Sequence, residues 1–345
     1  MKRGASLGRD GLPKRGPPSA HDVARLAGVS QAAVSRAFTP GASISDATRE
    51  KVFIAAKELG YRPNLLARSL IKGQSDIIGV VVGNARNPFF TVALDEMSLR
   101  LRRAGRHLLV FTGESNATAD LHVEDLLRFR VDALVLMWAT LSPTLAEQCR
   151  NDGIPVIFFN RRAGATEGFA TVAGANAEGA KQIANHMIGQ GYRRIALMAG
   201  LEDSSTSRER EASFTSQLIA NGLSLPERAV GQFRRREGME AARQLLSLTP
   251  RPDAIFCAND IMALGAIEVA RHEFGLEVGR EIGIAGFDDI DQAAWPSFQL
   301  TSYSQPVDTM MERVTELLLD RELYERLPHI VVEGELKIRG STRRT

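Results

Sequence analysis

The sequence predicts a small all-α helix-turn-helix headpiece followed by an α/β body of two doubly wound lobes. Three observations support this prediction. Short, capped helical patterns fill residues 19–62, apolar runs alternate with helical patterns from residue 77 onward, and this alternation restarts after Asn176. Repeated strand–helix alternation is typical of parallel sheets with right-handed crossovers. A chain of 345 residues suits two or three domains.

The headpiece begins with a predicted helix over residues 20–27. Ser19 can cap it, and Asp22 has the position of the acidic partner in a capping box. Gly28 supplies the backbone freedom that a sharp turn needs. The apolar stripe of this helix contains Val23, Leu26 and Ala27.

A second short helix over residues 31–38 follows that turn, with Ser30 as its cap. Two short helices joined by a tight glycine turn form a helix-turn-helix unit. A third helix over residues 46–59 completes a three-helix core. Side chains of the second helix can reach base edges in a major groove, where Arg bonds guanine, Gln bonds adenine and Ala touches a thymine methyl group. The predicted contact residues are Gln31, Ala32, Ser35 and Arg36.

The segment after Tyr61 predicts one or two further helical turns over residues 65–70. Pro63 breaks the chain before it, and Leu66 and Leu70 lie on one face, four residues apart. So short a helix is marginal alone in water, so we expect it to need a partner.

Charge is distributed unevenly along the chain. Residues 1–75 carry 13 Lys and Arg against 5 Asp and Glu, whereas the remainder carries 30 against 36. A basic head on a mildly acidic body is typical of a nucleic-acid-binding protein. The alternative, a solubilising basic tail, is weakened by the helix-turn-helix pattern within the basic part.

The body predicts two successive strand–helix series. Residues 77–82, 107–111, 133–138 and 156–159 are apolar strands with helices between them, and the second series places strands at 194–199, 229–233, 254–258 and 282–287. Two such lobes leave a cleft at the carboxyl ends of their strands, where small ligands bind. The residues that follow these strands are polar and aromatic, which suits a sugar-like ligand.

Other features of the sequence narrow the possible classes. Cys149 and Cys257 lie near apolar runs without the spacing of a metal site, so we expect free buried thiols in a reducing cytoplasm. We expect no signal peptide, no membrane span, no metal and no cofactor. Residues 1–18 are rich in Gly, Pro and basic residues and predict a disordered arm.

Several motifs together resemble one known family. The run DVARLAGVSQAAVSRAF, with SISDATREKV and ELGYRPNLLARSL after it, resembles the DNA-binding headpiece of the lactose/galactose-repressor (LacI/GalR) family of bacterial transcription regulators. In the body, NPFF, SRER, ANDIMALGA, IGIAGFDD and WPSFQLTSYSQPV resemble the effector domain of that family, which is similar to periplasmic sugar-binding proteins. The resemblance covers Ser19 to Thr342.

The resemblance implies roles for individual residues. Backbone contacts to DNA and a hinge in the minor groove fall on Ser19, Ser30, Asn64, Ala67, Arg68 and Leu70, with Leu70 as the wedge between base pairs. Effector contacts fall on Phe89, Asn160, Thr206, Arg210, Phe233, Asn259 and Asp288. Structural alternatives stand beside three of them. Arg210 could pair with a neighbouring glutamate on a helix surface, Asp288 could cap a loop, and Phe89 could be a core residue.

The sequence departs from the family pattern in the body. Asn160 stands where many members have an aspartate, Ala175 replaces the usual acidic residue, and Ser213 replaces a glycine. These departures affect which effector is bound more than whether an effector is bound.

The resemblance also implies three chain crossings between the lobes, near residues 174, 303–305 and 333–334. The expected organisation is an arm at 1–18, a headpiece at 19–62, a hinge and linker at 63–75 and an effector-binding and dimerisation body at 76–345. Its N-lobe contains about 76–173 and 305–333, and its C-lobe about 174–304 and 334–345.

These expectations combine into one functional hypothesis. A cytoplasmic homodimer binds double-stranded DNA at a pseudo-palindromic operator and acts as a repressor, and a small effector controls its affinity. No leucine heptads follow the last strand, so we expect no tetramerising coiled coil. The alternatives are a solute-binding protein, which should carry a signal peptide, and a sugar-processing α/β enzyme. No glycine-rich phosphate turn follows the first strand.

Overall fold

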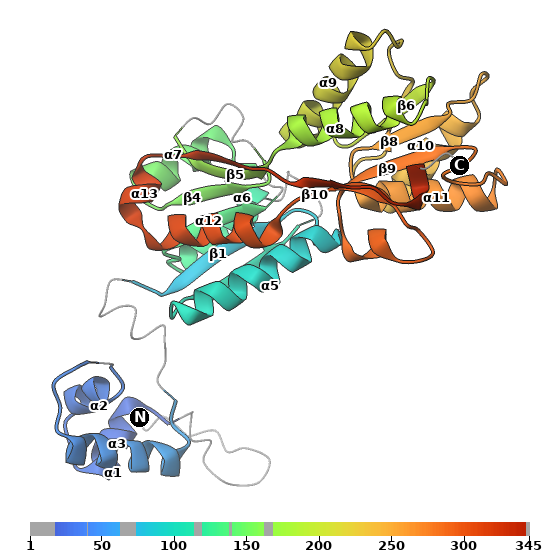
Figure 1. The fold of residues 1–345 in the computed structure, drawn as a ribbon. Coiled ribbons are helices and arrows are strands. Elements are labelled where there is room, and N and C mark those ends of the chain that lie inside the picture. The colour runs from blue at the N-terminus through green and yellow to red at the C-terminus, as the bar shows by residue number, and fades with distance from the viewer. Residues whose placement is uncertain are drawn as a thin grey trace, which may run out of the picture. The chain divides into compact units, whose positions relative to one another are not determined.

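The structure is a computed structural model that describes residues 18–39, 41–62, 74–113, 119–137, 140–161 and 168–342. The chain divides into two compact units, Met1–Ser75 and Asp76–Thr345. Each unit contains its own hydrophobic core. Figure 1 shows helices in the first unit and two α/β lobes in the second.

Over its described residues, the first unit is a helical headpiece made of α1 (Ala20–Ala27), α2 (Gln31–Ala37) and α3 (Asp46–Leu59). A capping box joins Ser19 and Asp22 at the start of α1, as the sequence predicts. Gly28 ends α1 in the left-handed conformation at φ 66°, which favours glycine. The caps and the turn therefore fix the boundaries of α1 and α2.

Small side chains fill the headpiece core, which contains Val23, Ala24, Val34, Ala37, Val52, Ala55 and Ala56. The prediction for Leu26 was wrong, because its side chain is 46% exposed. Ala24 is buried in the core instead, with 6% of its surface exposed. Phe38 lies at the edge of this core, with its ring centroid 5.2 Å from that of Phe53.

The N-lobe of the body contains a six-stranded parallel sheet in the order β11-β5-β4-β3-β1-β2. The strands are β1 (Ile77–Val82), β2 (His107–Thr112), β3 (Ala133–Met137), β4 (Val156–Phe159), β5 (Ala170–Gly174) and β11 (His329–Val332). Side chains of β1 alternate between two buried layers. Val80 and Val82 pack beneath α5 (Pro88–Arg103) and α12 (Val307–Leu319), whereas Val81 packs with α6 (Ala119–Arg128) and α7 (Pro143–Asn151).

The C-lobe repeats this plan with the order β12-β10-β9-β8-β6-β7. Its strands are β6 (Ile195–Ala199), β7 (Arg228–Val230), β8 (Ala254–Cys257), β9 (Gly283–Asp288), β10 (Thr301–Ser304) and β12 (Glu335–Lys337), of which β12 runs antiparallel to β10. The helices α8 (Asn176–Gly189) and α9 (Ser205–Ala220) cover one face, and α10 (Arg235–Leu246) and α11 (Asp260–His272) cover the other. Short helices complete the lobes: α13 (Arg321–Glu325), and the 3-10 turns Asp291–Ala294 and Gly340–Thr342.

The chain passes between the two sheets three times. It leaves β5 for α8 at Ala175, leaves β10 for α12 at Gln305, and leaves β11 for β12 at Gly334. These connections touch one another. The Ala175 amide donates to the Val332 carbonyl at 3.0 Å, and the Gly334 amide donates to the Tyr303 hydroxyl at 2.8 Å.

The strand–helix alternation predicts the interior elements of both lobes to within a few residues. The strands β5, β10, β11 and β12 and the helices α12 and α13 were not predicted. Each of these strands contains only three to five residues, and β11 alternates between exposed and half-buried side chains. They form strands because each is hydrogen-bonded to a neighbouring strand of its sheet.

Two further observations concern the class of the protein. Within the ranges described above, no helix combines the length and the apolar character needed to cross a lipid bilayer. Cys149 and Cys257 are free and buried, as expected from their apolar surroundings.

Candidate functional site

The helix α2 presents a small polar face to solvent. Ala33, Val34 and Ala37 turn into the headpiece core. The remaining side chains form the exposed face, and these are Gln31, Ala32, Ser35 and Arg36. The second helix of the headpiece therefore exposes the four residues that the sequence predicts to contact bases.

The predicted backbone-contacting serines lie at helix starts. The Ser30 hydroxyl accepts from the Ala33 amide at 3.2 Å, and the Ser19 hydroxyl accepts from the Asp22 amide at 3.3 Å. Both residues are exposed. The N-terminus of a helix attracts anions, so a phosphate can approach here. The other predicted residues of this group, Asn64, Ala67, Arg68 and Leu70, lie outside the described residues.

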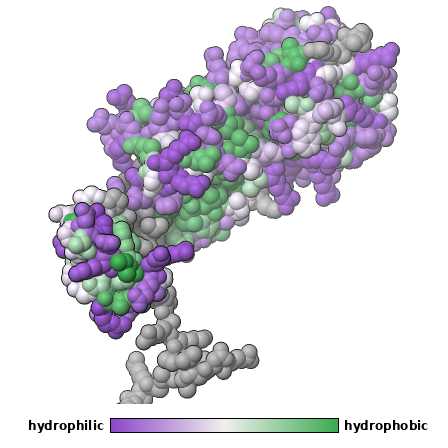
Figure 2. Space-filling model, turned by 60° about the horizontal axis from the view of Figure 1, so that its bottom comes forward, coloured by the Kyte–Doolittle hydropathy of each residue, from purple (hydrophilic) through white to green (hydrophobic). Residues whose placement is uncertain are grey.

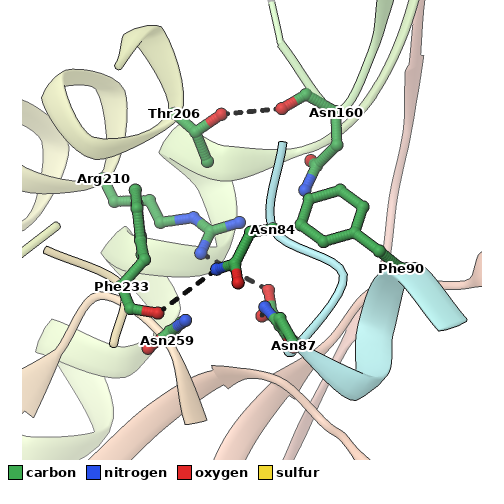
Figure 3. A pocket seen from close by; sticks show the side chains of 9 residues that line it. Asn84, Asn87, Phe90, Asn160, Thr206, Arg210, Phe233 and Asn259 are labelled. Atoms are coloured by element: carbon green, nitrogen blue, oxygen red, sulfur yellow. Dashed lines mark hydrogen bonds and ion pairs between the residues drawn. The ribbon is translucent and has the colours of Figure 1, made fainter. Parts of the chain in front are cut away.

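A cavity lies between the two lobes of the body. Side chains from both lobes point into it (Figure 3). The N-lobe contributes Asn84, Asn87, Phe90 and Asn160, and the C-lobe contributes Thr206, Arg210, Phe233, Asn259 and Asp288.

The lining residues follow strands, as expected for doubly wound sheets. Asn160 follows β4, Asn259 follows β8, and Asp288 ends β9. Two asparagines also cap helices that begin at the cavity. Asn87 accepts from the Phe89 amide at 3.1 Å, and Asn259 accepts from the Met262 amide at 3.1 Å. The caps fix the direction in which these two amides face.

Arg210 is the largest buried side chain at the cavity, with 1% of its surface exposed. Its Nε donates to Asn176 Oδ1 at 2.9 Å and its Nη1 donates to the Ala258 carbonyl at 2.5 Å. Its Cζ lies 3.6 Å from the centroid of the Phe287 ring, which gives a cation–π contact. These contacts hold the guanidinium group in one orientation.

Asp288 is the buried anion opposite Arg210. Its Oδ1 lies 3.4 Å from Arg210 Nη1 and accepts from Gln305 Nε2 at 2.7 Å, and its Oδ2 accepts from Asn87 Nδ2 at 3.4 Å. Asn87 belongs to the N-lobe and Gln305 to a connection between the lobes, so this carboxylate joins both lobes.

Burial is the largest cause of the pKa shifts of Arg210 and Asp288. It lowers the pKa of Arg210 to about 10, although the neighbouring Asp288 carboxylate acts in the opposite direction. Burial also raises the pKa of Asp288, while Arg210, Asn87 and Gln305 oppose the shift. Behind the cavity, burial and the charge of Asp288 raise the pKa of Asp260 well above its ordinary value.

Three lining residues have a backbone conformation that side-chain-bearing residues rarely adopt. The φ angles are 54° at Asn160, 58° at Phe233 and 114° at Asp288. Such conformations cost about 1–3 kcal/mol each and persist where the surrounding structure enforces them. Their concentration at one cavity is typical of a binding site.

Several buried polar atoms at the cavity lack a hydrogen-bond partner in the described structure. They are Asn160 Oδ1, Arg210 Nη2, Asn259 Nδ2 and, beside the lining, Gln305 Oε1. An unpaired buried polar atom costs about 1–3 kcal/mol, so a group that pairs with these atoms gains affinity. The cavity is therefore arranged to hold a small polar ligand.

The structure brings six of the seven predicted effector residues together at the cavity and places Phe89 elsewhere. The Phe89 ring stacks on Phe159, with centroids 5.8 Å apart, and is 2% exposed in the N-lobe core. The adjacent Phe90 lines the cavity instead. One residue along a helix rotates a side chain by about a quarter turn, which the spacing of predicted elements does not resolve.

The effector contacts implied by the family resemblance also leave out Asn84 and Asn87. Both follow β1 at its carboxyl end, which is where the sequence predicts a ligand-binding cleft. The amide of Asn84 donates to the Phe233 carbonyl at 3.5 Å and connects the two lobes at the cavity (Figure 3).

Comparison with known proteins agrees with this geometry. Residues 19–64 match the family of bacterial regulatory proteins called the lacI family, and residues 184–342 match a periplasmic binding protein-like domain. The HTH-type transcriptional regulator CelR of Thermobifida fusca is 31% identical over 340 residues, covering 96% of this chain and all of CelR. The chain belongs to the LacI family.

Two solved structures of LacI-family proteins extend this likeness to the fold. A complex of CelR with cellobiose is 30% identical and has a TM-score of 0.70, covering 94% of this chain and 99% of that one. The lac repressor dimer bound to operator and the anti-inducer ONPF is 27% identical, with a TM-score of 0.83 over 95% of this chain and all of that one. As a LacI-family member, the protein is a DNA-binding transcription regulator with a ligand-binding body. Its characterised relatives are regulators rather than enzymes.

Proposed function

We propose that the protein is a repressor that binds a pseudo-palindromic operator as a homodimer, with an affinity controlled by a sugar or sugar acid in the cavity. The observation that carries the proposal is the cavity itself. Two lobes enclose a buried ion pair, amides and two aromatic rings, with polar atoms left for a ligand. Carboxylate, amide and guanidinium groups bind hydroxyls, and aromatic faces cover the C–H surface of a sugar.

In the headpiece, Gln31, Ala32, Ser35 and Arg36 enter the major groove and read bases. Ser19, Ser30, Asn64, Ala67 and Arg68 hold the register on the backbone, and Leu70 wedges into the minor groove. The exposure of the α2 face supports the first group. The headpiece makes these contacts with DNA in the cytoplasm.

In the body, the residues assigned to the effector are Asn160, Thr206, Arg210, Phe233, Asn259 and Asp288, with Asn84, Asn87 and Phe90 added. Ligand binding shifts the relative stability of two lobe arrangements by its difference in affinity for them, typically about 1–3 kcal/mol. Asp288 and Asn84 each bond across the lobes, so a ligand that contacts them changes the contact between the lobes.

The dimer forms through the α5 side of the N-lobe. Exposed apolar side chains on α5 include Val92 and Leu99, which are 55% and 45% exposed, and Val110 lies 39% exposed on the edge strand β2. Figure 2 shows an apolar area on the body in the view that brings this side forward. An exposed apolar face beside an unpaired edge strand favours association with a second copy.

The protein is proposed to act without catalysis. Thr206 and Asp288 are the lining residues of a type that can serve as a nucleophile or base, but the Thr206 hydroxyl donates to the Asn160 carbonyl at 2.9 Å and Asp288 is held in the buried ion pair with Arg210. Turnover of a bound ligand by the purified protein would contradict this part.

The test is a fluorescence-anisotropy titration against DNA upstream of the protein's own and neighbouring genes, with random DNA as competitor. Specific binding should survive the competitor and change when sugars or sugar acids are added. Arg36→Ala should weaken specific binding by about 1–3 kcal/mol, because the lost side chain reads a base.

Arg243→Ala is the matched control, since it removes the same charge from the body, where Arg243 pairs with Glu273. It should leave operator affinity unchanged. If random DNA abolishes the binding and both variants lose affinity equally, the protein is attracted only to phosphates. That result would contradict the proposal.

A further inference from the structure

We infer that the effector is a hydroxylated carboxylic acid, bound as an anion with its carboxylate between Arg210 Nη2 and Asn259 Nδ2. This inference rests on the proposed function of the cavity and narrows the class of ligand. It follows from the hydrogen-bonding atoms that the protein leaves unpaired there.

The two unpaired donors at the cavity are fixed in direction. Arg210 uses Nε for Asn176 and Nη1 for Ala258 and Asp288, which leaves Nη2 for the cavity. Asn259 uses its oxygen to cap α11, so only its Nδ2 hydrogens face outward from the cap. Both side chains are 1% exposed, so water does not readily satisfy these donors.

Acceptors at the cavity are scarcer than donors. The Asp288 carboxylate already accepts from Gln305 and Arg210 at Oδ1 and from Asn87 at Oδ2, which occupies three of its about four acceptor sites. Among the lining residues, the buried acceptor that lacks a partner is Asn160 Oδ1. Gln305 Oε1 also lacks one, but it faces Gly174, where a Cβ atom would lie 2.3 Å away.

This balance of donors and acceptors distinguishes an acid from a neutral polyol. A hydroxyl that accepts from Arg210 or Asn259 brings a proton of its own, which needs an acceptor in the cavity. A carboxylate brings two acceptor oxygens and no proton, so it satisfies both donors at once. One hydroxyl elsewhere on the ligand then donates to Asn160 Oδ1.

Charge favours the same assignment. A guanidinium–carboxylate hydrogen bond is roughly twice as strong as a neutral one, and the effect grows where water is excluded. Burial already disfavours the charged form of Arg210. An anion at Nη2 compensates for that loss of solvation, whereas a hydroxyl does so only weakly.

The test uses pairs of probes that differ at one carbon. D-Gluconate and D-glucitol share four hydroxyl-bearing stereocentres and differ by a carboxylate against a hydroxymethyl group. D-Glucuronate with D-glucose, D-galacturonate with D-galactose and glycerate with glycerol extend the series. Calorimetric titration of the full chain should find an acid that binds at least about 100-fold tighter than its neutral partner. This is the difference in affinity expected for one or two charge-assisted hydrogen bonds.

The variant Asn259→Asp separates this site from general anion binding. Aspartate keeps the oxygen that caps α11 and suits a helix N-terminus, so the fold is retained. It replaces the Nδ2 donor with an anionic oxygen, so it should lower the affinity for the acid by at least about 10-fold. Asn185→Asp on the exposed face of α8 changes the net charge equally and keeps the acceptor for Gln217. It should leave the affinity within about 2-fold.

Three results would overturn the inference. These are equal affinity for an acid and its neutral partner, failure of every acid in the series to bind, or equal losses in the two variants. An operator complex that responds only to a neutral sugar would remove this inference and leave the proposed function intact. Absence of sequence-specific operator binding, with the acid still bound in the cavity, would count against the proposed function alone.

Discussion

Arg210 holds a positive charge in a part of the C-lobe that water barely reaches. Its guanidinium group contacts Asp288, Asn176, the Ala258 carbonyl and the Phe287 ring. Removing one partner of a buried ion pair leaves the other charge buried without a partner. This usually destabilises the fold more than removing both charges does. The pair therefore has a structural role that any test of ligand binding must separate from its binding role.

Arg210→Met should reduce the free energy of unfolding of the body by roughly 3–5 kcal/mol, because Asp288 then lies buried without its cation. Adding Asp288→Asn should restore much of that loss, since the amide carries no charge. Urea denaturation of the single and double variants measures both effects. A double variant less stable than the single variant would show that the ion pair is not the cause.

Asp260 supplies a pH-dependent part of the stability. It accepts from Ser302 Oγ at 2.6 Å and from the Ile290 amide at 2.9 Å, and its pKa is raised well above 3.8 by burial first and by Asp288 second. The folded chain thus holds this proton more tightly than the unfolded chain does. The contribution of Asp260 to stability is largest below its ordinary pKa and is lost as the pH rises through the raised value.

Asp260→Asn should flatten this dependence, because the amide oxygen still accepts from Ile290 and the side chain no longer titrates. The measurement is the free energy of unfolding of the wild type and the variant at several pH values from about 4 to 8. The difference between the two proteins should move in favour of the variant as the pH rises. A constant difference would assign the titration to another group.

At the scale of elements, the contact between the connecting segments decides how the lobes join. Gly334 packs so closely on the second connection that a Cβ atom there would lie 1.8 Å from the Ser304 carbonyl oxygen. Ser304 pairs with Glu335, the residue after Gly334, in the ladder between β10 and β12, so neither backbone segment moves without shifting a strand.

Gly334→Ala should therefore destabilise the body by about 1–3 kcal/mol, the usual cost of overpacking, and should displace the second connection. Gly189→Ala provides the control, because no atom lies within 4 Å of the added Cβ at this end of α8. That change should be neutral or stabilising by up to about 1 kcal/mol. Thermal denaturation of both variants checks the pair, and equal effects would refute the packing argument.

At the scale of the whole molecule, two units with separate cores must act together on DNA. In the proposed complex, each headpiece reads one half-site of the operator, so the affinity of the complex depends on joining two chains. The proposed α5 surface would supply that junction.

Leu99→Arg should weaken the dimer by at least about 10-fold, since it places a charge in an apolar interface, and operator affinity should fall with it. Leu225→Arg is the matched control, because Leu225 is 71% exposed on a C-lobe connection away from α5. Sedimentation equilibrium measures the association, and anisotropy measures the DNA affinity. A Leu99 variant that remains a dimer would place the interface elsewhere.

The sequence by itself determined the helix boundaries of the headpiece and the interior strands of both lobes. Local physical chemistry decides these features, through serine caps, the left-handed Gly28 and uninterrupted apolar runs. The positions after strands also predicted where the cavity lies, because the carboxyl ends of parallel strands meet at one edge, whereas its individual residues came from the resemblance to a known family.

Only the tertiary structure decided the remainder, because it depends on contacts between distant parts of the chain. Leu26 is exposed while Ala24 is buried, and Phe89 joins the core while Phe90 faces the cavity. The short strands β5, β10, β11 and β12 exist because neighbouring strands pair with them. The partners of Arg210 and Asp288 lie 17 to 201 residues away in the sequence, so folding alone brings them together.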